Sequence, residues 1–156
     1  MVLLVLILTI TCIPLTAMAS ESHGQVIDIL ADGYYITDPD GNVVPTARFT
    51  VDENVVLKPG YSLNAQNNVW YNGEILRFYA SVSNARVTDL ELKAQRVNSS
   101  KFNSLGSFIA TQGQWYGCLE CIGMPDGSQC YYRIKFINNG SSTMTIDSLT
   151  AKEYTP

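Results

Sequence analysis

Apolar side chains fall on every second position in several stretches of the chain. The clearest case contains Leu76, Phe78, Ala80 and Val82, separated by residues of more polar or mixed character. A period of two places such side chains on one face of a β-strand and leaves the other face for solvent. The same alternation predicts strands with one wet face at 76–82, 88–97, 132–136 and 143–147.

Shorter apolar runs extend this pattern over most of the chain. They predict further strands at 26–30, 34–37, 47–51, 54–57 and 108–111. Residues suited to turns separate the runs, because Pro fixes φ and Gly or Asn accepts a positive φ. These turns are expected at 38–42, 58–60, 71–73, 124–127 and 138–140.

No internal stretch has helical periodicity, and the turns recur at intervals typical of β-sandwiches and barrels. We therefore predict an all-β fold, an antiparallel β-sandwich of jelly-roll type, over residues 20–156 as a single domain.

The first nineteen residues differ from the rest because they contain no charged side chain. They are apolar from Val2 to Ile10 and end in Ala17-Met18-Ala19, which fits the small-x-small rule for signal cleavage. The apolar run is shorter than the roughly 20 residues of a membrane span. Residues 1–19 are predicted to be a secretory signal peptide, and the protein to be extracellular. The alternative is an uncleaved anchor, the one case in which a membrane would be a partner.

Charge and catalytic residue types narrow the function. The net charge is −4 and only 15% of residues are charged, which argues against nucleic acid as a partner. With a single His, no Ser-His-Asp or Cys-His set can be assembled. Glu74, Glu91 and Glu120 are interpreted as solvated charges rather than as a glycosidase pair. The sequence predicts a protein that is not an enzyme.

Three cysteines remain once Cys12 leaves with the signal peptide: Cys118, Cys121 and Cys130. In an oxidising compartment they predict one disulfide and one leftover thiol. A two-residue turn at 125–126 would place Cys121 opposite Cys130, which makes this the expected pair. A bulge would instead pair Cys118 with Cys130. The odd cysteine, Cys118 in the first arrangement, would be free or would cross-link subunits.

Zinc is the alternative use of these thiols, since Cys118 and Cys121 have the C-x-x-C spacing of a half-site. Cys130 could be a third ligand, but the single histidine, His23, is far away in sequence. The disulfide is therefore preferred, and no metal is expected at the cysteines.

Two sequons agree with secretion. Asn98 and Asn139 begin Asn-x-Ser triplets in predicted loops, where a glycan could be attached.

The C-terminal half resembles a known family. The runs that carry the likeness are 110–115, 124–127, 131–136 and 140–149. They resemble the ending of jelly-roll carbohydrate-binding modules of the galactose-binding-like kind. The resemblance implies a β-sandwich and, at Asp147, a ligand of a structural calcium ion. The acidic run at 38–42 lacks the distal Glu of a calcium loop and is expected to be a turn.

Two functions then follow from surfaces. The first is a cell-surface structural subunit, whose partners are copies of itself or other surface proteins. Such subunits can lend a terminal strand to a neighbour's open sheet. The candidates for that strand are Val26, Ile27, Ile29 and Leu30; the alternative is an ordinary first strand of the domain's own sheet.

The second function is binding to polysaccharide. Flat aromatic rings stack on sugar faces and bury area at low entropic cost. The stacking candidates are Tyr35, Tyr71 and Tyr116, chosen from a wider set of rings that also contains Tyr34, Tyr61, Trp70 and Trp115. Alternation predicts that one of Tyr34 and Tyr35 points inward instead.

Overall fold

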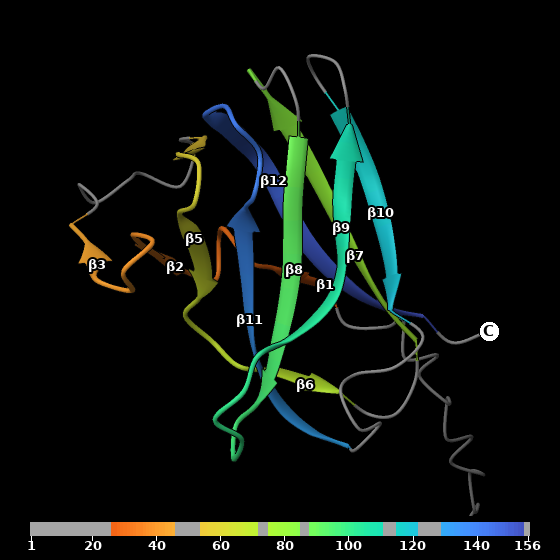
Figure 1. The fold of residues 1–156 in the computed structure, drawn as a ribbon. Coiled ribbons are helices and arrows are strands. Elements are labelled where there is room, and N and C mark those ends of the chain that lie inside the picture. Colours follow the sequence, from red (N-terminus) through yellow and green to blue (C-terminus); the bar gives the residue numbers. More distant parts are fainter. Residues whose placement is uncertain are drawn as a thin grey trace, which may run out of the picture.

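Two antiparallel sheets lie face to face in the computed structural model (Figure 1). The structure describes residues 26–45, 54–71, 75–84, 88–110, 115–121 and 129–154. For residues 115–121 it describes the backbone alone. Every regular element in these residues is a strand. None of the described segments forms a helix that could cross a membrane. The predicted all-β sandwich is confirmed.

One sheet has five strands. Their order is β1-β12-β7-β10, and β4 pairs with β12 beside β1. The strands are β1 (Val26–Asp28), β4 (Val55–Leu57), β7 (Ile75–Ser83), β10 (Trp115–Cys121) and β12 (Met144–Tyr154).

The other sheet has seven strands. Their order is β3-β2-β5-β11-β8-β9, and β6 pairs with β11 beyond the end of β5. The strands are β2 (Tyr34–Thr37), β3 (Val43–Val44), β5 (Ser62–Ala65), β6 (Val69–Tyr71), β8 (Thr88–Arg96), β9 (Asn103–Ala110) and β11 (Cys130–Asn138).

The core lies between the two sheets and consists of the alternating residues read from the sequence. The inward apolar residues of β7, β8, β11 and β12 are buried from Leu76 to Val82, from Leu90 to Ala94, from Tyr132 to Phe136 and from Met144 to Ala151. Phe78 of one sheet meets Phe136 of the other edge to face, with ring centroids 6.2 Å apart. Burial of apolar side chains contributed by both sheets is what holds the sandwich closed.

Strand lengths differ from prediction where local hydrogen bonds intervene. β1 stops at Asp28, whose carboxylate accepts hydrogen bonds from the backbone N–H groups of Leu30 and Ala31. That turn ends the strand earlier than the apolar run suggested. β3, β5 and β6, with two to four residues each, were not predicted. The strand expected at 47–51 lies outside the described residues.

The segment proposed for strand exchange is part of this domain's own sheet. Val26 and Ile27 pair with Lys152 and Ala151 of β12, and the N–H of Ile29 donates to the carbonyl of Leu149 at 2.9 Å. Ile29 is fully buried, and Ile27 and Leu30 pack against the core. In this chain the segment forms the ordinary first strand given above as the alternative, and the lending of the segment to a neighbouring chain stays a prediction.

The hairpin that supported the cysteine pairing is not formed. β10 pairs with β7, with Cys121 opposite Leu76, whereas β11 places Cys130 opposite Tyr71 of β6 in the other sheet. The chain passes from one sheet to the other between these two strands, because β10 pairs with β7 whereas β11 pairs with β5, β6 and β8. Cys130 is a half-buried free cysteine. The geometric argument for joining Cys121 to Cys130 was therefore wrong; the side chains of Cys118 and Cys121 lie outside the described residues.

Candidate functional site

The outer face of the seven-stranded sheet carries exposed aromatic side chains, Tyr35, Trp70 and Tyr131, beside polar ones. One row crosses four strands, from Tyr35 of β2 through Asn64 of β5 and Lys135 of β11 to Lys93 of β8. Neighbours in this row are Cα partners, so their side chains leave the same face of the sheet. The residues between them along each strand point into the core.

Exposed aromatic rings lie at two places on this face. Tyr35 is 41% exposed at one side of the row, and Trp70 and Tyr131 are 43% and 54% exposed. Trp70 of β6 and Tyr131 of β11 are Cα partners whose ring centroids are 4.9 Å apart in an edge arrangement. Tyr131 and Lys135 are four positions apart in β11, which is about 13 Å along the strand. The face thus presents two separate apolar platforms with polar groups between them.

Asn64 is the polar centre of the row. Its Nδ2 lies 3.2 Å from Thr37 Oγ1 and 3.4 Å from the carbonyl oxygens of Tyr35 and Ser62. These contacts fix the amide, since a buried donor needs a partner. Asn64 thereby ties β2 to β5 beneath the Tyr35 platform.

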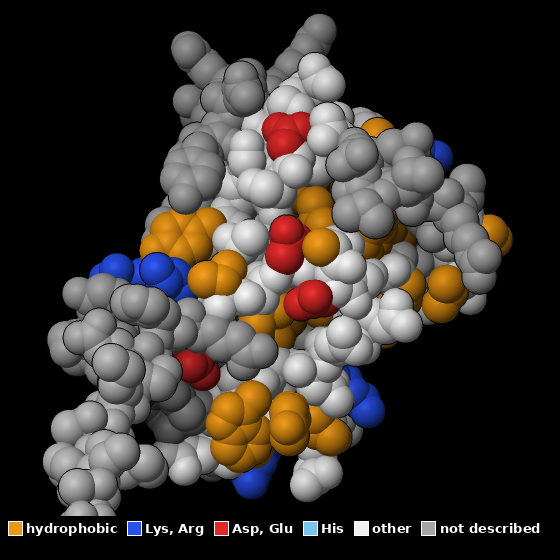
Figure 2. All heavy atoms as spheres, turned by 180° about the vertical axis from the view of Figure 1, so that it is seen from behind, with side chains coloured by type: hydrophobic (Ala, Val, Ile, Leu, Met, Phe, Trp, Pro, Cys, Tyr) orange, Lys and Arg blue, Asp and Glu red, His pale blue; other side chains and the backbone are white. Residues whose placement is uncertain are grey.

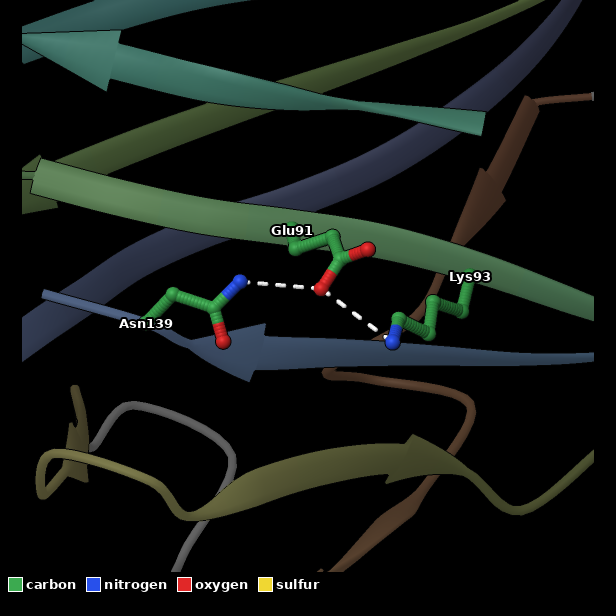
Figure 3. A network of polar contacts seen from close by, with 3 residues as sticks. All are labelled: Glu91, Lys93 and Asn139. Atoms are coloured by element: carbon green, nitrogen blue, oxygen red, sulfur yellow. Dashed lines mark hydrogen bonds and ion pairs between the residues drawn. The ribbon is translucent and has the colours of Figure 1, made fainter. Parts of the chain in front are cut away.

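Glu91 of β8 is held in a network beside the row (Figure 3). Its Oε2 accepts a hydrogen bond from Asn139 Nδ2 at 2.9 Å and lies 3.3 Å from Lys93 Nζ. Burial by itself would raise the pKa of Glu91, but hydrogen bonds from Asn139, Ser104 and Lys93 and the charge of Lys93 outweigh it. The pKa of Glu91 is therefore below its ordinary value, and the side chain is an anion at neutral pH.

Lys135 sits next to this network with its charge only half exposed. Its Nζ lies 4.3 Å from the ring centroid of Phe102, a cation–π contact. Burial is the main cause that lowers the pKa of Lys135, followed by repulsion from Lys93; the charge of Glu91 acts in the opposite direction. The protein thus keeps a cation where its own surroundings disfavour one.

The opposite side of the molecule has a different character (Figure 2). Acidic side chains lie along the middle of the visible face, and basic ones lie toward its edges. The exposed large hydrophobic residues of the five-stranded sheet are aliphatic, Val26 and Val56, and among the described side chains of that sheet no large aromatic is as exposed as the rings named above. An aromatic platform therefore distinguishes the outer face of the seven-stranded sheet.

The stacking candidates have separate outcomes. Tyr35 is exposed, while its neighbour Tyr34 packs against the core as alternation predicted. Tyr71 is only 3% exposed and meets Tyr132 edge to face at 6.2 Å, so it is a core residue and its assignment as a sugar platform was wrong. The side chain of Tyr116 lies outside the described residues.

Sequence reasoning missed Tyr131, and it did not select Trp70 from the wider set of candidate rings. The signal was available, because Tyr131 alternates with the buried Tyr132 and therefore had to face outward with Arg133 and Lys135. Trp70 likewise stands between two buried residues of β6. What sequence lacked was the pairing of β6 with β11, which brings the two rings together.

The remaining predicted site residues lie apart from this face or outside the described part. Asp147 Oδ1 accepts a hydrogen bond from Ser83 Oγ at 2.8 Å, and its Oδ2 is buried without a hydrogen-bond partner. Within the described ranges, no three His, Cys, Asp or Glu side chains gather as metal ligands. One carboxylate is a small part of the six to eight oxygens that calcium requires, so the calcium ligand stays a prediction.

The acidic run at 38–42 is a turn, as expected. Asp38 accepts hydrogen bonds from the backbone and side-chain nitrogens of Asn42, at 2.8 and 3.0 Å, and joins β2 to β3. Those hydrogen bonds, the side-chain one first, lower the pKa of Asp38.

The sequons and the other carboxylates complete the account. Asn98 and Asn139 are both exposed, Asn98 just after β8 and Asn139 just after β11, and glycosylation stays a prediction. Glu91 belongs to the polar network described above. The side chains of Glu74 and Glu120 lie outside the described residues.

Comparison with known proteins gives a fold but no family by sequence. No family model matches the chain, and no curated protein matches it. Among solved structures, the C-terminal CBM6 of LamC, a marine laminarinase from Zobellia galactanivorans, superposes with a TM-score of 0.51 at 10% identity, covering 83% of this chain and all of that one.

A second solved structure gives the same result. It contains the CBM22-1 and GH10 modules of the Clostridium thermocellum endo-1,4-beta-D-xylanase 10B in complex with xylohexaose. The TM-score is 0.51 at 9% identity, over 86% of this chain and 29% of that one. Both matches agree with the two-sheet topology and with the resemblance seen in the C-terminal half. The chain therefore has the β-sandwich fold of carbohydrate-binding modules.

Proposed function

We propose that this protein binds polysaccharide on the outer face of its seven-stranded sheet. The observation that carries the proposal is the placement of three exposed aromatic rings, Tyr35, Trp70 and Tyr131, on the one face that also carries a row of polar side chains. Aromatic rings supply stacking area for the apolar faces of sugars, and fixed polar groups supply hydrogen bonds to hydroxyl groups.

The spacing of the platforms favours a chain over a single sugar. Tyr131 and Lys135 are about 13 Å apart along β11, which exceeds the size of one sugar ring. A ligand that touches both Tyr35 and the Trp70–Tyr131 pair must therefore contain several linked sugars. Secretion, predicted from residues 1–19, would bring the protein to such polymers.

The structural neighbours support this function over the assembly of filaments. One is a CBM6 by name, and the other contains a CBM22-1 module together with a GH10 module and was crystallised with xylohexaose. The segment 26–30 is the strand that the assembly hypothesis offers to a neighbour, and its residues 26–28 are paired with β12 of the same chain.

Affinity electrophoresis in gels that contain a soluble polysaccharide tests the proposal. The panel consists of xylan, laminarin and polygalacturonate. We expect at least one polymer to retard the protein, and we expect Tyr35→Ala and Trp70→Ala each to weaken that binding about tenfold through loss of ring contact.

Matched variants separate stacking from other effects. Tyr35→Phe and Trp70→Phe keep a ring and should retain most of the affinity, while Val56→Ala truncates an exposed side chain of the other sheet and should change nothing. The proposal fails if no polymer of the panel retards the protein, or if Val56→Ala weakens binding as much as Tyr35→Ala does.

A further inference from the structure

We propose that the bound polysaccharide is acidic, with its anionic groups held by Lys93, Lys135 and Arg133. This inference rests on the proposed function and names the class of ligand for the same face. The three side chains, called here the cationic strip, lie on adjacent strands: Lys93 on β8, and Lys135 and Arg133 on β11.

The charges of this face are sorted along the strands. Lys135 is the Cα partner of Lys93, and Arg133 is the next outward residue of β11 toward Tyr131. Glu91 and Asp89 precede Lys93 in β8 and lie toward the N-terminal end of that strand, away from the Trp70–Tyr131 pair. From Lys93 to the Trp70–Tyr131 pair, the charged outward residues among those described are all cations, namely Lys93, Lys135 and Arg133.

Two lysines placed directly opposite each other are unfavourable for the free protein. Like charges on a cross-strand pair repel, and partial burial of the Lys135 ammonium adds a desolvation cost. Glu91 compensates only part of this repulsion, because its Oε2 contacts Lys93 and also accepts a hydrogen bond from Asn139. The chain as a whole has net charge −4, so a cluster of cations is contrary to its average composition. An anionic ligand would relieve the repulsion on binding.

The strip is also held in place for such a ligand. Phe102 lies under the Lys135 ammonium at 4.3 Å, which limits where that charge can go. Arg133 is exposed, and its planar guanidinium suits bidentate contact with a carboxylate. Tyr35 stands on one side of the strip and Tyr131 at its end, so that stacking and charge pairing can act on the same chain of sugars.

The test compares polymers that differ in charge. Polygalacturonate, the same polymer after methyl esterification of its carboxylates, dextran and dextran sulfate are used in affinity electrophoresis and in calorimetric titration. We expect polygalacturonate to bind at least about tenfold more tightly than its methyl ester, since hydrogen bonds to charged groups are roughly twice as strong as neutral ones. Added salt should weaken this binding.

Lysine variants locate the effect. Lys135→Gln and Lys93→Gln should each weaken binding to polygalacturonate about tenfold and leave binding to the methyl ester unchanged. Lys152→Gln is the control and should have no effect, because it removes the same charge from an exposed residue of β12 in the other sheet. Lys135→Gln should not lower the urea midpoint of unfolding, because it removes a cation that burial disfavours; a purely structural lysine would lower it.

The outcomes separate the two proposals. Preference for dextran sulfate over polygalacturonate, with the same lysine dependence, supports the inference with sulfate as the anionic group. Equal binding to polygalacturonate and its methyl ester, lost in Tyr35→Ala but not in Lys135→Gln, overturns the acidic ligand and leaves the proposed function intact. Absence of binding to every polymer, neutral or acidic, overturns both.

Discussion

Asn138 shows how a single polar residue can close one end of this sandwich. Its side chain is fully buried, yet each of its polar atoms has a partner. Nδ2 donates to the carbonyls of Leu57 and Ser142 at 2.9 and 3.0 Å, and Oδ1 accepts from the N–H of Gly140 at 2.9 Å. The amide thus joins β4 to the turn between β11 and β12. Sequence placed a turn here but gave no sign of this link between the two sheets.

We expect Asn138→Ala to lower the free energy of unfolding by about 2–4 kcal/mol, because it leaves buried carbonyls and an N–H without partners. Urea unfolding followed by tryptophan fluorescence measures the change. Asn98→Ala, in an exposed turn, is the control and should stay within about 0.5 kcal/mol of the parent. A loss as small as that for Asn138→Ala would show that these contacts do not support the fold.

At the scale of the element, a β-bulge in β9 decides which side chains reach the candidate site. Leu92 of β8 is opposite Gly106, but the next residue, Lys93, is opposite Ser104, so Leu105 is the extra residue. The shift turns Ser104 and Phe102 outward, toward Glu91 and Lys135. It also breaks the alternation of apolar residues, which explains why only the second half of this strand was predicted.

The bulge depends on Gly106, whose φ of 140° is one that L side chains rarely adopt. Gly106→Ala should lower the free energy of unfolding by about 1–3 kcal/mol through backbone strain. It should also weaken polysaccharide binding, since Phe102 would lose its position under Lys135. Ser107→Ala, the next residue in the same strand, serves as control. Unchanged stability and binding in Gly106→Ala would contradict the role given to the bulge.

For the whole molecule, the question is which chain supplies the first strand. β1 covers part of the edge of β12 in its own sheet, and Ile29, which follows it, is 1% exposed in the core. A domain that fills this place with its own residues does not need a neighbour's strand. The pairing of β1 within its own sheet is therefore consistent with the β-sandwich fold of carbohydrate-binding modules.

We expect Ile29→Ala to lower the free energy of unfolding by about 2–5 kcal/mol, the range for removing a large aliphatic side chain from a core. Val26→Ala, which truncates the 60% exposed residue of the same segment, should stay within about 0.5 kcal/mol. The stability of Ile29→Ala should not depend on protein concentration. Dependence on concentration would indicate that the segment is exchanged between chains.

The sequence by itself determined the fold class and the inward faces of the long strands. A period of two is a local property, so β7, β8, β11 and the start of β12 could be placed, with their buried residues, from neighbours along the chain. The bulge between Ile146 and Ser148 shifts the alternation, so the rest of β12 was not predicted. The turn at Asp38 was predictable for the same reason, because its hydrogen bonds to Asn42 span only four residues.

Tertiary structure decided which strands became neighbours, and with them the candidate site. Trp70 meets Tyr131 only because β6 pairs with β11. Tyr35 aligns with Lys135 only because β5 lies between β2 and β11. The pairing of strands also buries Tyr71 in the core and places β10 and β11 in different sheets. Such contacts join residues far apart in the chain, and they are chosen by the packing of all apolar faces at once, which no local pattern records.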